Sequence, residues 1–160
     1  MKGASILING NQPNGRFLEG IIYGTPAPGT VMEKVPGVEL QNGRYTYRAV
    51  QTGANGDRRP QYVLLEDASQ GVVADINGAN TYTNGRWGFL YVPLPGDELN
   101  MLFKNIAGTG DDFAIGDKAM VDAATGKLIA GTGSAVSQPY EVGETVSALT
   151  ADTLIAVMYT

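Results

Sequence analysis

Short segments in which apolar and polar residues alternate follow one another along most of this chain. The clearest is 98–104, where Leu99, Met101 and Phe103 share one side and polar residues occupy the other. A two-residue period is typical of a strand with one wet face. Glycine or proline interrupts every segment that could keep helical spacing over about eleven residues. The pattern predicts an all-β protein, a small β-barrel or sandwich of short strands. The expected strands are 4–8, 17–23, 30–35, 44–51, 61–66, 72–76, 86–94, 98–104, 113–115, 118–122, 127–130, 140–142, 145–149 and 154–159.

The most apolar segment, RWGFLYVPL, departs from this alternation. Trp87, Phe89 and Tyr91 fall on one face, and Leu90 and Val92 fall on the other. A strand that is apolar on both faces is either central to its fold or covered on one side by another chain. The face of Trp87, Phe89 and Tyr91 is therefore a candidate surface for packing against another subunit.

Breaks rich in proline and glycine separate the first two strands from the rest. The segment NGNQPNG lies between 4–8 and 17–23, and GTPAPG follows the second strand. We interpret 1–29 as an extended N-terminal arm that adds a strand to a neighbouring subunit, and 30–160 as the barrel domain. The alternative is that these are two ordinary edge strands of the same barrel. The contact residues expected in the arm are Ile6, Leu7, Ile8, Phe17, Ile21 and Tyr23, with Arg16 assisting.

The amino-acid composition excludes several kinds of catalytic and metal-binding site. The chain of 160 residues contains no cysteine and no histidine, which removes thiol catalysis and the commonest general base and metal ligand. Charged residues make up 17%, against the usual ~25%. Low charge on a β protein favours a surface that is partly covered by partners, although a compact domain with a polar, uncharged surface has the same composition.

Charge is distributed unevenly along the chain. Residues 1–60 hold seven Lys/Arg and four Asp/Glu, net +3, and residues 61–160 hold four and twelve, net −8. A mildly basic leading segment suits contact with an acidic neighbour, whereas nucleic acid would need a dense basic stripe. No apolar run approaches the ~20 residues of a membrane helix. We expect a protein made in a cytoplasm that binds neither nucleic acid nor membrane.

The remaining candidates for catalytic or metal-binding residues are carboxylates that stand beside turn glycines. Asp111, Asp112 and Asp117, or Asp97 with Glu98, offer the acid and base of a glycosidase, and the first three also offer oxygens to calcium. Adjacent strand residues point to opposite faces, and Asp commonly stabilises Gly-containing turns. The turn interpretation is therefore favoured, and we expect no enzyme activity, no cofactor and no metal site.

An aromatic sugar platform is a second alternative. Tyr82 in the polar loop NGANTYTNG, together with Trp87, lies near Asn80, Asn84 and Arg86 in the sequence. Packing in the core or at an interface explains these aromatic residues more simply.

The second half of the chain resembles the capsid decoration, or cement, proteins of tailed bacteriophages. The resemblance is carried by GDELNMLF, GDDFAIGDKAMVDAATGKLIAG and YEVGETVSALTADTLIAVMY, with PAPGTVMEKV similar to the start of such a barrel. It implies a small β-barrel that binds the outside of an assembled capsid and clamps neighbouring major capsid protein subunits. It also implies a homo-oligomer, with a trimer favoured over a dimer, on the capsid exterior of a virion. A carbohydrate-binding β module, or a tail or fibre subunit, is the alternative function.

Overall fold

The computed structural model describes residues 5–8, 15–35, 44–51, 62–105, 112–122, 124–130, 139–147 and 149–160. These residues form two closed five-stranded barrels, one from each half of the sequence. The prediction of an all-β fold of short strands closed into a small barrel is confirmed. The chain nevertheless forms two barrels where one was expected.

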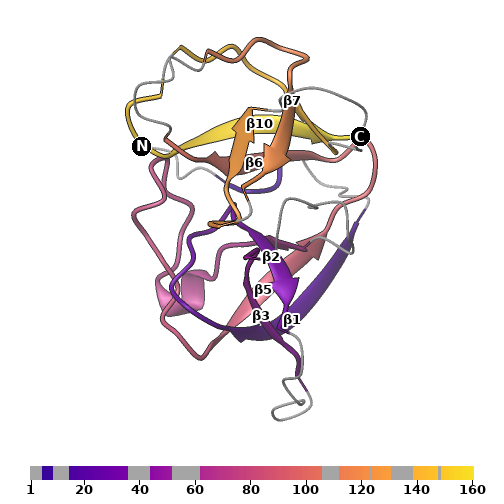
Figure 1. The fold of residues 1–160 in the computed structure, drawn as a ribbon. Coiled ribbons are helices and arrows are strands. Elements are labelled where there is room, and N and C mark those ends of the chain that lie inside the picture. Colours follow the sequence, from indigo (N-terminus) through magenta and orange to yellow (C-terminus); the bar gives the residue numbers. More distant parts are fainter. Residues whose placement is uncertain are drawn as a thin grey trace.

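Each barrel takes its strands from one continuous part of the chain. The first consists of β1 (Arg16–Ile22), β2 (Val31–Lys34), β3 (Thr46–Ala49), β4 (Tyr62–Leu64) and β5 (Arg86–Val92), and a turn of 3₁₀ helix, η1 (Ala68–Gln70), lies between β4 and β5. The second consists of β6 (Glu98–Phe103), β7 (Lys118–Val121), β8 (Leu128–Ala130), β9 (Tyr140–Val142) and β10 (Thr153–Tyr159). Figure 1 shows the first barrel below and the second above.

The two barrels have the same topology. The strand order is β1-β3-β2-β4-β5 in the first and, starting from β6, β6-β8-β7-β9-β10 in the second. In each barrel the first and third strands are parallel and every other pair is antiparallel. The register also agrees, because Ile22, the last residue of β1, lies opposite Tyr47, and Phe103, the last residue of β6, lies opposite Leu128. The fold is therefore an internal repeat.

A matching glycine turn precedes the second strand of each barrel. Residues 27–30 and 114–117 both close with a hydrogen bond from the fourth N–H to the first carbonyl. Gly29 and Gly116 have φ of 89° and 93°, a conformation that favours glycine. Each also donates its N–H, at 2.8 Å, to the last carbonyl of the fourth strand of its barrel.

Paired glycines make room for aromatic side chains inside the first barrel. Gly20 of β1 lies opposite Gly88 of β5, on the inward face of both strands. A Cβ at Gly20 would come within 2.4 Å of the Tyr47 ring, and one at Gly88 within 2.9 Å of the Tyr82 ring. These rings fill the barrel in a core cluster that also contains Met32, Tyr62, Leu64 and Leu90.

A second, larger core cluster joins the two barrels. It includes Val31 and Tyr91 from the first barrel and Leu99, Phe103 and other side chains from the second. Backbone hydrogen bonds also cross this seam: the Val31 N–H donates to Gly126 O at 2.8 Å, and the Leu102 N–H donates to Gly29 O at 3.0 Å. The two barrels therefore share one core.

The structure corrects the division of the chain at residue 29. The segment 16–22, assigned to an arm, is β1 and pairs with β5 over its whole length. Residues 5–8 pair with the second barrel of the same chain, where Leu7 lies opposite Leu99 and Ile6 is fully buried. The proline and glycine residues that follow β1 build the turn at 27–30 rather than a boundary. The alternative of ordinary strands within the fold is the correct one for 16–22.

The strand expected at 72–76 is also wrong. Val72 forms an isolated bridge to Asp67, and residues 76–78 turn through Gly78. Asp67 accepts hydrogen bonds from the backbone N–H and the hydroxyl of Ser69, which hold the chain in η1. At the end of the expected strand the Asp75 carboxylate accepts the N–H groups of Asn77 and Ala79, and these local bonds favour a turn there.

Candidate functional site

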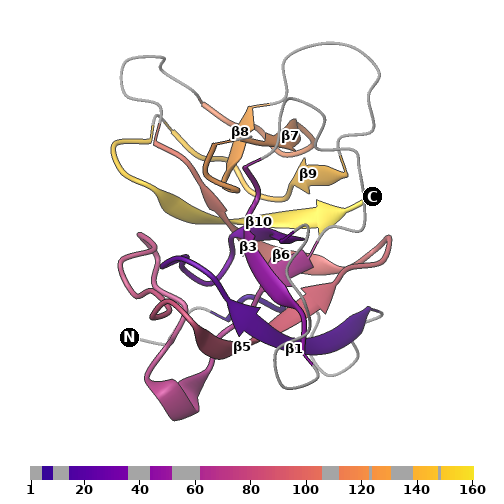
Figure 2. The same cartoon turned by 60° about the horizontal axis from the view of Figure 1, so that its bottom comes forward.

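A cluster of exposed aromatic side chains lies on the outer face of β1 and β5. Across this antiparallel pair Phe17 lies opposite Tyr91, Glu19 opposite Phe89, and Ile21 opposite Trp87. Directly opposite residues point to the same face of a sheet, so these six side chains share it. Figure 2 shows β1 and β5 side by side at the front of the lower barrel.

Four aromatic residues remain exposed there. The exposed fraction is 57% for Phe17, 46% for the neighbouring Tyr45, 42% for Trp87 and 39% for Phe89. We call these four residues the aromatic face. A shallow hollow of ≈ 500 Å³ is lined by three of them together with Leu18, Glu19, Arg44 and Tyr47. Clustered exposed aromatic residues are characteristic of surfaces that bind other proteins.

Cations lie over two of the rings. The guanidinium of Arg44 is 5.0 Å from the Trp87 ring centre, and the Lys34 ammonium is 3.8 Å from that of Tyr45. Arg44 also forms an ion pair with Glu19 at 2.8 Å. Because both groups of this pair are exposed, the ion pair contributes little to folding. Its effect is to hold a basic group beside the rings.

At the other end of β5, Tyr91 is covered at the seam, although Phe17 opposite it stays exposed. Tyr91 is fully buried, and its hydroxyl donates to Asp97 Oδ2 at 2.6 Å and accepts the Gly15 N–H at 2.5 Å. Burial and the bond to Asp97 raise the pKa of Tyr91 to about 12. A strand that is apolar on both faces was expected to be either central or covered by another chain. In β5 the second barrel covers Tyr91, while Trp87 and Phe89 stay exposed.

The structure divides the predicted contact residues between two places. Arg16, Phe17, Ile21, Trp87, Phe89 and Tyr91 lie together on β1 and β5, although Ile21 and Tyr91 are buried there. Ile6, Leu7 and Ile8 lie beside β6 of the second barrel, and Tyr23 is exposed at the end of β1. The sequence analysis missed Lys34, Arg44 and Tyr45, which reach the aromatic face from β2 and the segment before β3.

The sugar platform considered as an alternative at Tyr82 is not formed. Tyr82 is 1% exposed, and its hydroxyl donates to Leu65 O at 2.9 Å inside the first barrel. Its N–H donates to Pro26 O, which ties the two loops around it together. The polar residues that flank Tyr82 suggested an exposed loop, but the ring fills the space opened by Gly88.

Two of the candidate carboxylates, Asp97 and Asp117, accept hydrogen bonds that stabilise the fold. Asp97 is buried and accepts bonds from Tyr91 and from the Leu94 N–H, and Asp117 accepts the Ala114 N–H in its turn. Asp111 lies outside the described residues. Among the residues that the structure describes, no group of three or more carboxylates is placed to hold a metal ion, and no helix is long and apolar enough to cross a bilayer.

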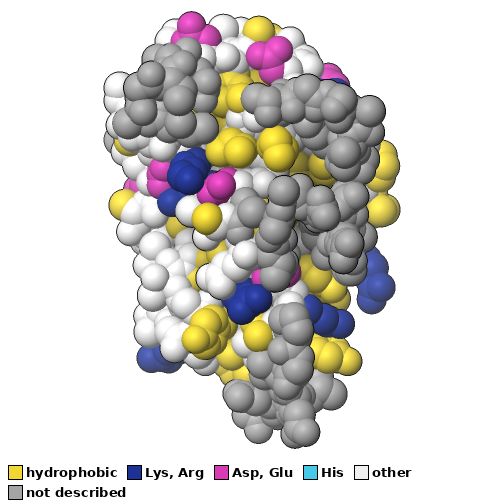
Figure 3. Space-filling view, viewed as in Figure 1, with side chains coloured by type: hydrophobic (Ala, Val, Ile, Leu, Met, Phe, Trp, Pro, Cys, Tyr) yellow, Lys and Arg dark blue, Asp and Glu magenta, His cyan; other side chains and the backbone are white. Residues whose placement is uncertain are grey.

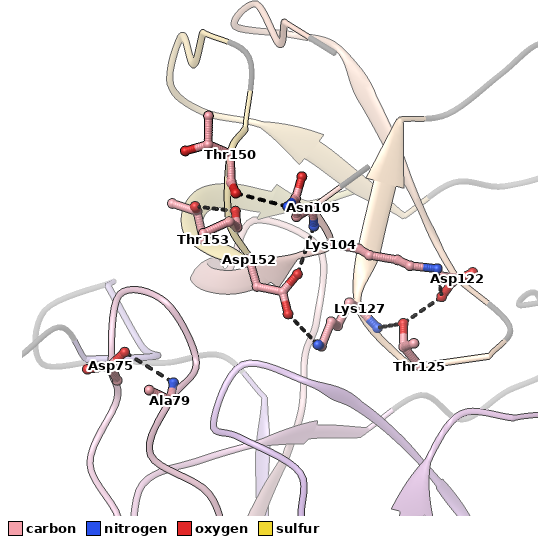
Figure 4. Close-up of polar contacts among 11 residues, drawn as sticks. Asp75, Ala79, Lys104, Asn105, Asp122, Thr125, Lys127, Thr150, Asp152 and Thr153 are labelled. Atoms are coloured by element: carbon pink, nitrogen blue, oxygen red, sulfur yellow. Dashed lines mark hydrogen bonds and ion pairs between the residues drawn. The ribbon is translucent and has the colours of Figure 1, made fainter. Parts of the chain in front are cut away.

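A polar network lies at the edge of the second barrel, near the seam. Figure 4 shows Lys104 paired with Asp122 at 3.1 Å and Lys127 paired with Asp152 at 2.5 Å, with Thr125 donating its hydroxyl to Asp122. Burial alone would raise the pKa of Asp152, but the Asn105 N–H and the Lys127 ammonium outweigh it and hold the pKa below its ordinary value. The Thr125 hydroxyl and Lys104 likewise outweigh burial and lower the pKa of Asp122. The network therefore favours ionised carboxylates.

A groove of ≈ 320 Å³ adjoins this network at the seam. Its lining includes Tyr23, Thr30, Arg48 and Lys127. Both cations are already paired, Arg48 with Glu33 at 3.0 Å and Lys127 with Asp152. The groove therefore offers no excess charge to an ionic ligand.

The two barrels differ in charge. Described residues 15–92 hold five Lys/Arg and five Asp/Glu, net 0, whereas described residues 98–160 hold three and seven, net −4. In Figure 3 basic side chains lie beside apolar ones on the lower barrel, and most of the visible acidic side chains lie on the upper. The protein thus has a neutral barrel with cations on its aromatic face and an acidic barrel.

No protein-family model matches this chain, and no curated protein sequence matches it.

Proposed function

We propose that this protein is a structural component of a virion that binds the outer surface of an assembled phage capsid and links neighbouring major capsid protein subunits. The observation that carries the proposal is the aromatic face, where Phe17, Tyr45, Trp87 and Phe89 are exposed on a rigid sheet beside Arg44. Aromatic residues and arginine are the types enriched at protein interfaces. The resemblance of residues 96–159 to capsid decoration proteins supplies the partner.

The architecture suits a clamp. The two barrels share one core, so they are joined by packed side chains and not by an exposed linker that could act as a hinge. A force on one barrel is therefore transmitted to the other through these side chains. Two different surfaces on such a body can hold two neighbouring subunits at a fixed spacing. No step of this function requires a cofactor or a reacting group.

Stabilisation follows from mass action. A protein that binds the assembled shell, and not its separated subunits, adds its binding free energy to the stability of the shell. Many copies on one shell, each touching more than one subunit, increase the effect through avidity.

The test is co-sedimentation of the purified protein with expanded shells that lack it. We expect saturable binding to expanded shells and none to free capsid subunits. Trp87→Glu should reduce occupancy at least tenfold, because one lost aromatic contact at an interface centre is worth about 2 kcal/mol or more. Val73→Glu is the matched control, since Val73 is an equally exposed apolar residue outside the aromatic face.

Equal affinity for shells and for free subunits would contradict the proposal. Binding to a glycan array with no binding to shells would support the carbohydrate-binding alternative instead. Thermal unfolding of each variant verifies that the substitution leaves the fold intact.

A further inference from the structure

Within the chain, one end of the first barrel covers one face of the second. The loops after β1 and before β5 lie against β6 and β10, where Gly29 O accepts the Leu102 N–H at 3.0 Å and Ile76 O accepts the Leu154 N–H at 2.7 Å. A Cβ at Gly29 would come within 2.8 Å of the Leu154 side chain. One end of the outer face of the β6–β10 pair is thereby buried, with Leu102 1% and Leu154 7% exposed.

The equivalent outer face of the first barrel is partly open, because Trp87 and Phe89 are exposed although Ile21 is buried. In each barrel the last residue of the first strand lies opposite the first residue of the fifth strand: Ile22 opposite Arg86, and Phe103 opposite Thr153. Counting along β5 and β10 from these pairs, Trp87 corresponds to Leu154 and Phe89 to Ala156. Where Leu154 is covered, Trp87 and Phe89 are 42% and 39% exposed. Trp87 therefore repeats a position that is buried elsewhere in the same chain, whereas Phe17 repeats Glu98, which is exposed.

The loops equivalent to the covering loops are open too. Residues 112–117 and 143–147 of the second barrel are joined by two 2.9 Å hydrogen bonds between Phe113 and Val146. We call these residues the loop end. Gly116 corresponds to Gly29, yet a Cβ there would meet nothing within 4 Å, and Ile115 beside it is 70% exposed. Figure 1 shows these loops at the top of the molecule, opposite β1 and β5 at the bottom.

The charges of the two open surfaces are complementary. The loop end exposes Asp112, Asp117 and Glu144, whereas Lys34 and Arg44 lie over rings of the aromatic face and, among the described residues, only Arg44 is paired there with an acidic group, Glu19. Two acidic barrels repel each other, so contact between the loop end and the aromatic face is favoured over contact between two loop ends.

From these equivalences we infer that copies of this chain associate head to tail, with the loop end of one copy packed on the aromatic face of the next. Ile115 lies against Trp87 and Phe89, in the way that Gly29 and its loop lie against Leu154 within the chain. The Leu102–Gly29 hydrogen bond has no counterpart, because the Ile21 N–H already donates to Tyr45 O at 3.0 Å. Association therefore depends on apolar burial and on charge, and weakens in high salt.

A head-to-tail contact uses a different surface on each copy. Such contacts close into a ring or extend into a chain of subunits. The inference rests on the proposed function for the homo-oligomer that the resemblance to capsid decoration proteins implies. It gives the aromatic face of each copy to the next copy, so Trp87→Glu lowers shell occupancy because the oligomer and its avidity are lost. It concerns the isolated protein and is tested without shells.

The test is analytical ultracentrifugation of the wild type and two complementary variants. Trp87→Glu places a carboxylate on the aromatic face, and Ile115→Gln replaces the exposed apolar side chain of the loop end by a polar, uncharged one that cannot form an ion pair with that carboxylate; each should be a monomer alone. Their equimolar mixture retains one intact contact, between the normal loop end of the first variant and the normal aromatic face of the second. It should therefore form a one-to-one dimer and nothing larger.

Matched controls make the same substitutions elsewhere on the same barrels. Val73→Glu in the first barrel and Met158→Gln in the second, at residues 47% and 40% exposed, should associate like the wild type. A wild type that stays monomeric, an Ile115→Gln variant that still associates, or a mixture that does not dimerise would each overturn the inference. Those results leave shell binding by monomers intact, whereas oligomers that do not bind shells would contradict only the proposed function.

Discussion

At the scale of single residues, charged side chains near the seam act through local pairs. Asp152 accepts the Asn105 N–H at 2.8 Å and pairs with Lys127, and these contacts hold its pKa below the ordinary value despite burial. A carboxyl group whose pKa is lowered by folding stabilises the native state when it is ionised.

Asp152→Asn should therefore lower the free energy of unfolding by about 1 kcal/mol at neutral pH. The stabilisation by Asp152 is complete above the unfolded-state pKa of about 4 and is lost as pH falls through the lower folded-state pKa. Urea unfolding at pH 7 and at about pH 2 should show the difference between wild type and variant shrinking in acid. A difference that persists undiminished at the lower pH would show that the ionised carboxylate is not its source.

At the scale of elements, the glycine pair between β1 and β5 decides how the first barrel is filled. A Cβ at Gly88 would come within 2.5 Å of Ile22 Cγ1, a distance that side chains do not tolerate. The same strand, β5, directs Trp87 and Phe89 outward. The packing inside the barrel and the composition of the aromatic face therefore both depend on the register of β1 against β5. Because β1 belongs to this barrel, a chain lacking residues 1–24 cannot be expected to keep the first barrel folded.

Gly88→Ala should destabilise the protein by about 2 kcal/mol, through overpacking of the barrel core. Gly143→Ala is the matched control, because the nearest atom to its added Cβ is the Ala156 carbonyl oxygen at 3.2 Å. Thermal melts should show a clear fall for the first and a much smaller one for the second. Equal melting temperatures for Gly88→Ala and the wild type would contradict the packing described here.

In this chain the local pattern of apolar and polar residues predicts individual strands well, but it predicts poorly which strands and side chains come together in the fold. The alternation at 98–104 identified β6 with the correct inward residues, and the apolar segment identified β5. The repeat was missed, although APGT at 27–30 and AIGD at 114–117 stand before corresponding strands. These two turns have only Ala and Gly in common. Their other two residues differ because each loop has different surroundings in the folded chain. The cations of the aromatic face were missed because Lys34 and Arg44 meet the rings through tertiary pairing, which sequence spacing does not encode.

At the scale of the whole molecule, the large core cluster extends from Val31 and Tyr91 to the interior of the second barrel. Cooperative unfolding follows when two units share buried contacts. We expect one calorimetric transition, with a calorimetric enthalpy equal to the van't Hoff enthalpy. Two resolved transitions would mean that the barrels unfold independently and that the seam contributes little.

The direct measurement of cementing is the disruption temperature of expanded shells as the protein is added. If the protein clamps neighbouring subunits, this temperature rises with occupancy and stops rising when sites are full, and Trp87→Glu shifts the rise to higher concentration. A disruption temperature that stays constant while the protein occupies the shell would contradict the account.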